Sequence, residues 1–182
     1  MSGPGRLVAV AGASGVGKDS LIRALAAALP GLEPVRRVIT RPAGDGAEDH
    51  EPASAAAFRA RAAAQGFCLW WEAHGLCYGI PAEVARDVAA GAGRIVNLSR
   101  AVLPEAALLF PGLTVLHVTA RPETLARRLS GRGREDAAGI AERLARAARP
   151  LPPGVAVLDL PNDGPFDQTV ARALALLAVR TG

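Results

Sequence analysis

The stretch VAVAGASGVGKDSL, from Val8 to Leu21, decides the fold of this 182-residue chain. It begins as an apolar run typical of a β-strand and continues into a glycine-rich loop, Gly12–Lys18, with the spacing G-x-x-x-x-G-K. A helical pattern of apolar residues follows directly. Strand, loop and helix in this order predict a P-loop, whose backbone N–H groups and helix N-terminus bind phosphate while Lys18 reaches the outer phosphates. A glycine-rich turn without a ligand would not explain a lysine at this spacing.

The residue after Lys18 departs from the usual motif. Asp19 stands where most P-loops have Ser or Thr, and the hydroxyl comes one position later, at Ser20. Asn97 ends the third predicted strand, where an aspartate usually helps to hold Mg²⁺. Two hypotheses stay open: phosphates, water and Ser20 hold the metal with Asp19 behind them, or Asp19 only balances the charge of the helix N-terminus.

Composition excludes several classes of protein. Apolar residues make up 50% of the chain and charged residues 21%, which is typical of a globular domain, and we expect a single domain spanning 1–182. No apolar run is long enough to cross a membrane, and the start of the chain has no secretory pattern, so a cytoplasmic location is expected. The net charge of +4 comes mainly from localised arginines, which favours small phosphorylated ligands over nucleic acid.

Strand-like and helix-like segments alternate along the chain. The strand-like runs are Leu7–Ala11, Arg37–Thr40, Arg94–Leu98, Thr114–Thr119 and Val155–Leu160. The helical patterns are Ser20–Leu29, Ala53–Gln65, Ala82–Ala90, Leu103–Leu108, Pro122–Leu129, Gly139–Ala148 and Pro165–Val179. This alternation after a P-loop predicts an α/β fold of the P-loop NTPase type, with a five-stranded, mostly parallel sheet covered by helices on both faces.

Two segments interrupt the alternation, and both are expected at the ligand-binding edge of the sheet. Residues 37–80 hold most of the aromatic side chains and are predicted to bind the acceptor. Residues 127–149 contain seven arginines and are predicted to form a lid. Guanidinium groups hold phosphate oxygens in pairs, so we assign Arg128, Arg132 and Arg143 to the transferred group. The remaining four are interpreted as a solvated basic face: Arg127, Arg134, Arg146 and Arg149.

Several strings together resemble the guanylate kinases, in that family's own order. They are Ile39-Thr40-Arg41-Pro42, Trp70 through Tyr78-Gly79, Arg128-Leu129-x-x-Arg132-Gly133, and Arg143-Leu144. Asn162-Asp163 is similar to the loop beside the adenine. The resemblance implies ATP with Mg²⁺ as cofactors and an acceptor phosphate near Arg41 and Tyr78. The residues expected to bind ATP are Gly12, Ala13, Ser14, Gly15, Val16, Gly17, Lys18, Asp19, Ser20 and Asn162.

The acceptor side departs from that family where a purine would be recognised. Leu69 and Ile80 stand where guanylate kinases have polar base-reading residues, and burying guanine against them would leave its polar groups unpaired, at about 1–3 kcal/mol each. Further departures are Arg37 for a serine, His50 for a tyrosine, and Asn97 and Ser99 for two aspartates. An acceptor with two phosphates and no base fits these changes.

The chain as a whole resembles the ribose 1,5-bisphosphate phosphokinases, guanylate kinase relatives of phosphonate catabolism. The shared strings are Gly17-Lys18-Asp19-Ser20-Leu21, Asn97-x-Ser99-Arg100, Arg132-Gly133-Arg134-Glu135 and Arg143-Leu144-Ala145-Arg146-Ala147. The resemblance implies phosphorylation of ribose 1,5-bisphosphate by ATP, giving 5-phosphoribosyl 1-diphosphate and ADP. One acceptor phosphate would be bound by Arg37, Arg41, His50 and Tyr78, the other by Arg100, and the sugar hydroxyls by Asn97 and Ser99. Catalysis would depend on Lys18, Arg128, Arg132 and Arg143.

Two alternatives remain at this point: a nucleoside monophosphate kinase with an altered base pocket, and a non-catalytic guanylate kinase-like binding module. Retention of Lys18, Arg132 and Arg143 speaks against the module. The expected partner is a small phosphorylated sugar, with no nucleic acid and no membrane, and the chain is expected to be a monomer or homodimer. Ser20 and Asp19 are the candidate metal-binding residues.

Overall fold

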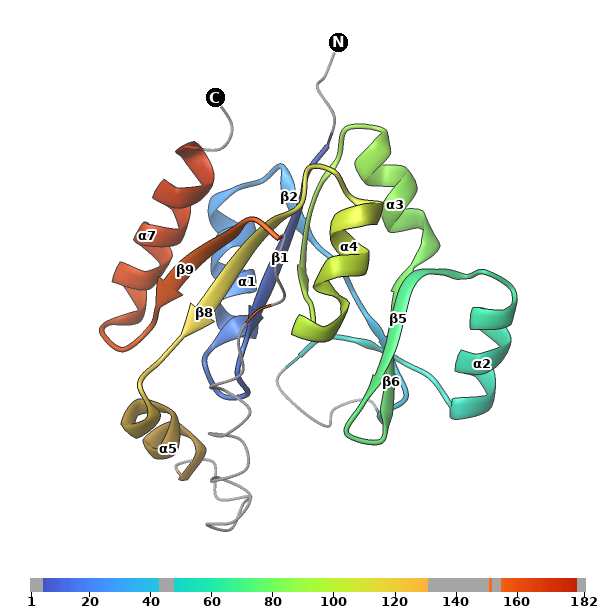
Figure 1. Cartoon of the computed structure of the whole chain (residues 1–182), viewed down its shortest axis with the longest axis horizontal. Helices are drawn as coiled ribbons and strands as arrows, with labels where there is room; N and C mark the ends of the chain where they lie inside the picture. Colours follow the sequence, from blue (N-terminus) through green and yellow to red (C-terminus); the bar gives the residue numbers. More distant parts are fainter. Residues whose placement is uncertain (1–4, 43–47, 131–150, 152–154, 180–182) are drawn as a thin grey trace.

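A computed structural model describes residues 5–42, 48–130, 151 and 155–179 (Figure 1). A central sheet of five strands has the order β2-β7-β1-β8-β9, and each pair of neighbours is parallel. Its strands are β1 (Leu7–Gly12), β2 (Leu32–Pro34), β7 (Gly93–Asn97), β8 (Thr114–Thr119) and β9 (Val157–Pro161). A parallel sheet of this kind places the carboxyl ends of β1 and β7 side by side, where the P-loop begins.

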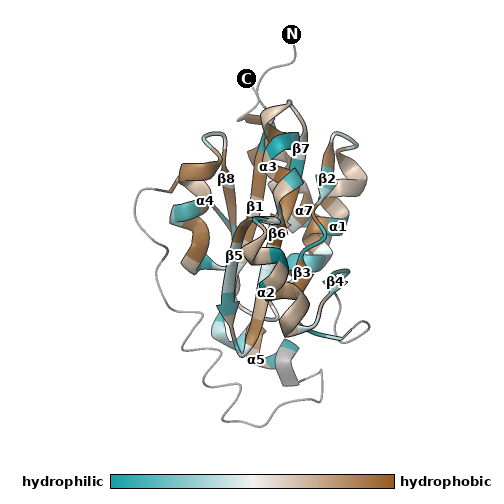
Figure 2. Ribbon diagram, turned by 90° about the vertical axis from the view of Figure 1, so that its right-hand side faces the viewer, coloured by the Kyte–Doolittle hydropathy of each residue, from teal (hydrophilic) through white to brown (hydrophobic). Residues whose placement is uncertain are grey.

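Helices cover both faces of this sheet (Figure 1). They are α1 (Lys18–Ala28), α3 (Ala82–Ala89), α4 (Leu103–Leu109) and α7 (Phe166–Val179). Helix α5 (Pro122–Ser130) lies beyond the carboxyl end of β8, and a short 3₁₀ turn, η1 (Arg100–Val102), precedes α4. Val8 and Val10 of β1 pack with α1 and α7, whereas Leu7, Ala9 and Ala11 pack with α3 and α4. Because alternate side chains of a strand point to opposite faces, β1 must be apolar throughout, as its colouring in Figure 2 shows.

A second, smaller sheet has the order β4-β3-β6-β5 and lies beside helix α2 (Ala55–Ala63). Its strands are β3 (Val38–Ile39), β4 (Glu51–Pro52), β5 (Phe67–Ala73) and β6 (Leu76–Pro81). The two-residue turn His74-Gly75 joins β5 to β6, and both residues have positive φ angles of 54° and 72°. Such a turn matches the twist of an antiparallel hairpin. We call residues 37–42 and 48–81, which form these strands and α2, the acceptor lobe.

Most predicted elements are confirmed to within a few residues, but one predicted strand lies in the wrong sheet. Residues Arg37–Thr40 were expected in the central sheet, yet Val38–Ile39 pairs with β4 and β6, and Leu32–Pro34 fills the edge position beside β7. Leu32 is the one buried residue of that edge strand, so its sequence carries no clear strand periodicity. The β5–β6 hairpin was not predicted. The expected helix at 139–148 lies outside the described residues.

Among the described residues, no helix has the length and apolarity that a membrane crossing requires.

Candidate active site

The P-loop follows β1 and leads directly into α1. Gly17 precedes the helix with a φ of 97°, a left-handed conformation that favours glycine. Because Gly17 has no side chain to cap the helix, the first N–H groups of α1 remain available to an anion. Gly12 is also required, since a Cβ there would lie 2.3 Å from the carbonyl oxygen of Val118. The loop therefore has the backbone geometry that the predicted phosphate site requires.

Lys18 lies over this loop and is surrounded by charged groups. Its Nζ donates hydrogen bonds to the carbonyl oxygens of Gly12, at 3.0 Å, and Ala13, at 2.8 Å. Burial lowers the pKa of the Lys18 amine from 10.5 to about 8, opposed first by the negative charge of Asp19. The same pKa is lowered by Arg37 and Arg100 and raised by Glu48, which lie farther along the chain. The acceptor lobe and the end of β7 thus lie within electrostatic range of the P-loop lysine.

Asp19 makes a direct contact with the end of β7. The Asn97 side-chain amide, Nδ2, donates a hydrogen bond of 3.2 Å to Asp19 Oδ1. Ser20, the other candidate metal ligand, has an exposed side chain. In the part of the chain that the structure describes, no cluster of three or more His, Cys, Asp or Glu residues could enclose a metal. Mg²⁺ is commonly held by one or two carboxylates together with substrate phosphates, so the carboxylate of Asp19 beside Lys18 fits this ion.

Asn162 supports the P-loop from beneath. Its side chain is 3% exposed; Nδ2 donates to the carbonyl oxygen of Val16 at 2.8 Å, and Oδ1 accepts from the Thr169 hydroxyl at 2.9 Å. A Cβ added to Gly17 would lie 3.0 Å from the same Nδ2. The resemblance predicted that Asn162 contacts the nucleotide. Both ends of its amide bind protein groups, so Asn162 supports the loop, and its contact with the nucleotide stays a prediction.

Arg37 is already paired within the acceptor lobe. It is 6% exposed, and its Nε and Nη2 both bind the carboxylate of Glu48, the former at 2.6 Å from Oε1. The guanidinium lies 5.0 Å from the ring centre of Tyr78 and 5.7 Å from that of Trp71. These two rings stack on each other, with centres 5.4 Å apart. The fork predicted to bind an acceptor phosphate is therefore occupied by Glu48, a residue that the sequence analysis did not select.

His50 is likewise held by the protein. Its ring is 5% exposed, with Nδ1 3.1 Å from the Glu48 carbonyl oxygen and Nε2 3.2 Å from that of Arg41. Arg41 Nη2 lies 3.5 Å from His50 Nδ1. The imidazole thus joins the backbone on both sides of residues 43–47. It contacts the backbone of Glu48 and Arg41 here, and binding of a phosphate by His50 stays a prediction.

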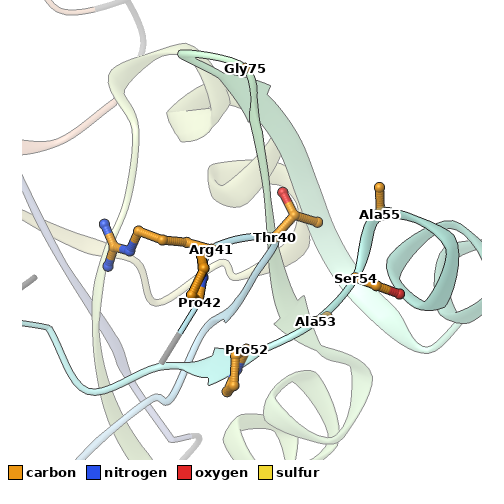
Figure 3. A pocket seen from close by; sticks show the side chains of 8 residues that line it. All are labelled: Thr40, Arg41, Pro42, Pro52, Ala53, Ser54, Ala55 and Gly75. Carbon is orange, nitrogen blue, oxygen red and sulfur yellow. The ribbon is translucent and has the colours of Figure 1, made fainter. Parts of the chain in front are cut away.

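Arg41 has the more available guanidinium of these two arginines. Its Nε is buried and has no hydrogen-bond partner among the residues that the structure describes. The backbone near Arg41 borders a cavity of about 460 Å³, also lined by Thr40, Pro42, Pro52, Ala53, Ser54, Ala55 and Gly75. Figure 3 shows the Arg41 side chain pointing away from Ser54 and Ala55. An unsatisfied buried donor indicates that a ligand or another group completes its contacts.

Asn97, Ser99 and Arg100 lie together where β7 ends. Ser99 Oγ accepts a hydrogen bond of 3.4 Å from the Ala101 N–H and so caps η1, which begins at Arg100. Asn97 was predicted to bind a sugar hydroxyl, but its amide donates to Asp19 on the nucleotide side. The two residues predicted to bind the sugar are therefore both engaged within the protein, and Arg100 is the charged group of this cluster.

The predicted lid is described only at its start. Arg128 is partly buried in the last turn of α5, whereas Arg127 beside it is exposed, the order expected if Arg128 has the functional role. Arg132 and Arg143 lie outside the described residues. Lys18, the remaining residue predicted to be catalytic, lies within the described residues.

Two residues of the site were missed by sequence analysis. Glu48 pairs with Arg37 across a polar loop, and Thr169 of α7 holds Asn162. Neither lies in a motif or at a periodic spacing from its partner. A buried arginine does require a carboxylate, and that requirement could have directed a search to the acidic residues after Arg41.

No protein-family model matches the sequence. A ribose 1,5-bisphosphate phosphokinase PhnN from Ruegeria sp. (strain TM1040) is 49% identical over 174 residues, covering 95% of this chain and 92% of the relative. Another, from Pseudofrankia inefficax, is 51% identical over 168 residues, covering 89% of this chain and 85% of the relative.

The fold has a solved counterpart in a guanylate kinase from Anaplasma phagocytophilum. The TM-score is 0.68, with 18% sequence identity, over 98% of this chain and 87% of the other. This likeness establishes the fold, whereas the sequence relatives establish the family. The chain belongs to the ribose 1,5-bisphosphate phosphokinase family, a group of kinases with a guanylate kinase-like fold.

Proposed function

We propose that this chain transfers the γ-phosphoryl group of ATP to ribose 1,5-bisphosphate, forming 5-phosphoribosyl 1-diphosphate and ADP. One observation supports the proposal: arginines lie within electrostatic range of the P-loop lysine, and the two positions at which guanylate kinases would read a purine are apolar and buried. Leu69 is 2% exposed and Ile80 1%, while Arg37 and Arg100 lie within electrostatic range of Lys18. The Leu69 and Ile80 side chains have no hydrogen bonds to offer a base, whereas an arginine offers charge to a phosphate.

We propose that separate arginines bind the two phosphates of the acceptor. Arg41, whose Nε has no hydrogen-bond partner in the described part of the chain, and Tyr78 would bind one phosphate, and Arg100 the other. Arg37, Glu48 and His50 act through these residues: the Arg37–Glu48 pair lies against Tyr78, and His50 holds the backbone of Arg41. A bidentate guanidinium–phosphate contact fixes both position and orientation.

The reaction needs positioning and charge neutralisation more than a base. A non-bridging oxygen of the C1 phosphate, already ionised near neutral pH, forms a bond to the γ-phosphorus, and the bond from that phosphorus to the β-phosphate oxygen breaks. The P-loop would hold the triphosphate and Lys18 would neutralise its outer oxygens. Mg²⁺, when bound near Asp19, would neutralise further phosphate charge. Arg128, Arg132 and Arg143 are proposed to surround the transferred group.

An acceptor comparison tests the proposal. ADP release is measured with ribose 1,5-bisphosphate, GMP, AMP or gluconate at equal concentrations. We expect turnover with the bisphosphate to exceed that with each other acceptor by at least about 10²-fold, because an apolar pocket leaves the base of GMP or AMP unpaired and gluconate has no phosphate for the arginines to bind. Phosphorus NMR should show a new diphosphate attached to the sugar.

Other outcomes would overturn it. Faster turnover with GMP or AMP would identify a nucleoside monophosphate kinase. No ADP release with any acceptor, from a folded protein that binds ATP, would favour a binding module.

A further inference from the structure

The hydrogen bond between Asn97 and Asp19 joins two positions whose residue types are reversed relative to most P-loop enzymes. Usually the residue after the P-loop lysine is a Ser or Thr that binds Mg²⁺, and a carboxylate stands on a nearby strand. Here the carboxylate follows Lys18, and the neutral donor, Asn97 Nδ2, lies on β7 at 3.2 Å. The pair of positions still carries one carboxylate and one neutral hydrogen-bonding side chain, but the carboxylate now follows the lysine and the neutral side chain is on the strand.

We propose that Asp19 and Asn97 have exchanged these roles: Asp19 is the protein carboxylate that binds the Mg²⁺ of the nucleotide, and Asn97 is a positioning residue that orients it. This inference rests on the proposed binding of ATP at the P-loop. It does not depend on which acceptor the enzyme uses.

The topology explains why the two positions can exchange. Asn97 pairs in register with Val10 of β1, so β7 ends beside the strand that feeds the P-loop. The bond from Asn97 reaches Asp19 Oδ1, and among the described residues Oδ2 has no hydrogen-bond partner. A second carboxylate at position 97 would stand close to the first and repel it. With a carboxylate at position 19, a neutral hydrogen-bond donor such as Asn97 is therefore favoured at position 97.

The electrostatics favour a metal ligand over a simple helix charge. Asp19 is next to Lys18, whose amine is expected to meet the outer phosphates. A carboxylate this close to a triphosphate would weaken ATP binding unless a cation lay between them. Ser20, one position along α1 and rotated by about 100° about the helix axis, has an exposed side chain. The hydroxyl of Ser20 is therefore the weaker candidate.

Nucleotide binding without acceptor provides the test. The affinity for a non-hydrolysable ATP analogue is measured by calorimetry, with Mg²⁺ and with EDTA, for Asp19→Asn, Asp19→Ser, Asn97→Asp and the double variant Asp19→Ser/Asn97→Asp. Mn²⁺ binding in the presence of the analogue is followed by electron paramagnetic resonance. Asp167→Asn is the matched control, since Asp167 is an exposed acid in the first turn of α7.

In the wild type, Mg²⁺ should tighten analogue binding. Asp19→Asn and Asp19→Ser should lose about tenfold or more of this tightening while binding the metal-free analogue at least as well as the wild type. Asn97→Asp should weaken metal-free binding. The double variant, which restores the usual arrangement, should recover most of the Mg²⁺ effect and the Mn²⁺ signal, and Asp167→Asn should retain both.

The proposal is overturned if Asp19→Asn keeps the full Mg²⁺ effect, because Asp19 would then only balance the helix charge. It is also overturned if Ser20→Ala removes the effect, or if the folded double variant binds Mn²⁺ no better than Asp19→Ser. Failure of the acceptor assay with these binding results intact would instead count against the proposed function alone.

Discussion

The nucleotide side and the acceptor side of this site are built in different ways. The P-loop is one continuous stretch, Gly12–Lys18, and its geometry comes from backbone angles and a helix N-terminus. The acceptor lobe is an assembly of side chains from separate segments, in which Arg37, Glu48, Trp71 and Tyr78 hold one another. A site formed by the backbone of one segment can be predicted from local sequence. A site formed by paired side chains cannot be predicted in the same way, because the partners are distant in the chain.

The largest effect is expected in the acceptor lobe, from Glu48→Ala. The side chains of Arg37 and Glu48 are only 7% and 16% exposed, so removing the carboxylate leaves a buried guanidinium unpaired. We expect the free energy of unfolding to fall by about 3–5 kcal/mol. Urea denaturation measures this loss. The double variant Arg37→Met/Glu48→Gln should recover part of the stability, and a loss below about 1 kcal/mol for Glu48→Ala would show that the pair is not buried in solution.

On the nucleotide side, Lys18→Met should lower kcat by about 10²–10³-fold, since it removes a cation from the transferred phosphoryl group. The stability of this variant should rise, although its activity falls. Burial lowers the pKa of Lys18 to about 8, so near neutral pH the folded protein holds a desolvated charge that methionine lacks. Lys18→Met should therefore be more stable than the wild type at pH 7, by at most about 3 kcal/mol.

The pH dependence checks the cause of that gain. Between pH 8 and the ordinary lysine pKa of 10.5, the unfolded chain holds a proton on Lys18 that the folded chain has released. Stability of the wild type then rises with pH through this window, relative to the variant. Thermal unfolding at pH 7 and pH 10 should show the stability difference shrinking. A difference that is constant with pH would mean that packing, and not the charge, explains it.

Arg41→Ala and Arg100→Ala sharpen the assignment of the acceptor side. Each removes hydrogen bonds to a charged phosphate, so the KM for ribose 1,5-bisphosphate should rise about 10- to 100-fold while the KM for ATP stays within a few-fold. Steady-state kinetics with one substrate varied at a time separates the two constants. If neither variant changes the KM for the bisphosphate, the acceptor is bound elsewhere.

Asn162→Ala should break the link between α7 and the P-loop. The variant leaves the Val16 carbonyl and the Thr169 hydroxyl without their partner, at a cost of about 1–3 kcal/mol in stability. ATP affinity should fall while the KM for the acceptor is unchanged. Thr169→Val, which removes one of the two bonds and keeps the shape, should have a smaller effect. If the affinities for ATP and for the acceptor fall equally, Asn162 has no specific role in supporting the P-loop.

The smallest effect is expected from Arg36→Ala, the neighbour of Arg37. Arg36 pairs with Asp49 at the surface, with side chains 60% and 81% exposed. Exposed ion pairs contribute little, so unfolding free energy should fall by less than about 1 kcal/mol and salt should not change the result greatly. Side-by-side denaturation of the Arg36 and Glu48 variants contrasts an exposed ion pair with a buried one. Similar losses in unfolding free energy for the two variants would show that burial does not make the Arg37–Glu48 pair more important for stability than the Arg36–Asp49 pair.

The sequence by itself determined the P-loop, the alternation of strands and helices, and the family. These features depend on residues close together in the chain: a glycine that can adopt a φ of 97°, a lysine at fixed spacing, and apolar residues at helical or strand period. Only the tertiary structure decided that Leu32–Pro34 forms the edge strand of the central sheet. It also decided that Glu48 pairs with Arg37, and that Asn97 donates a hydrogen bond to Asp19, 78 positions away in the sequence. Pairing between distant side chains leaves no periodic trace in a sequence, because it is the fold that brings the partners within hydrogen-bonding distance.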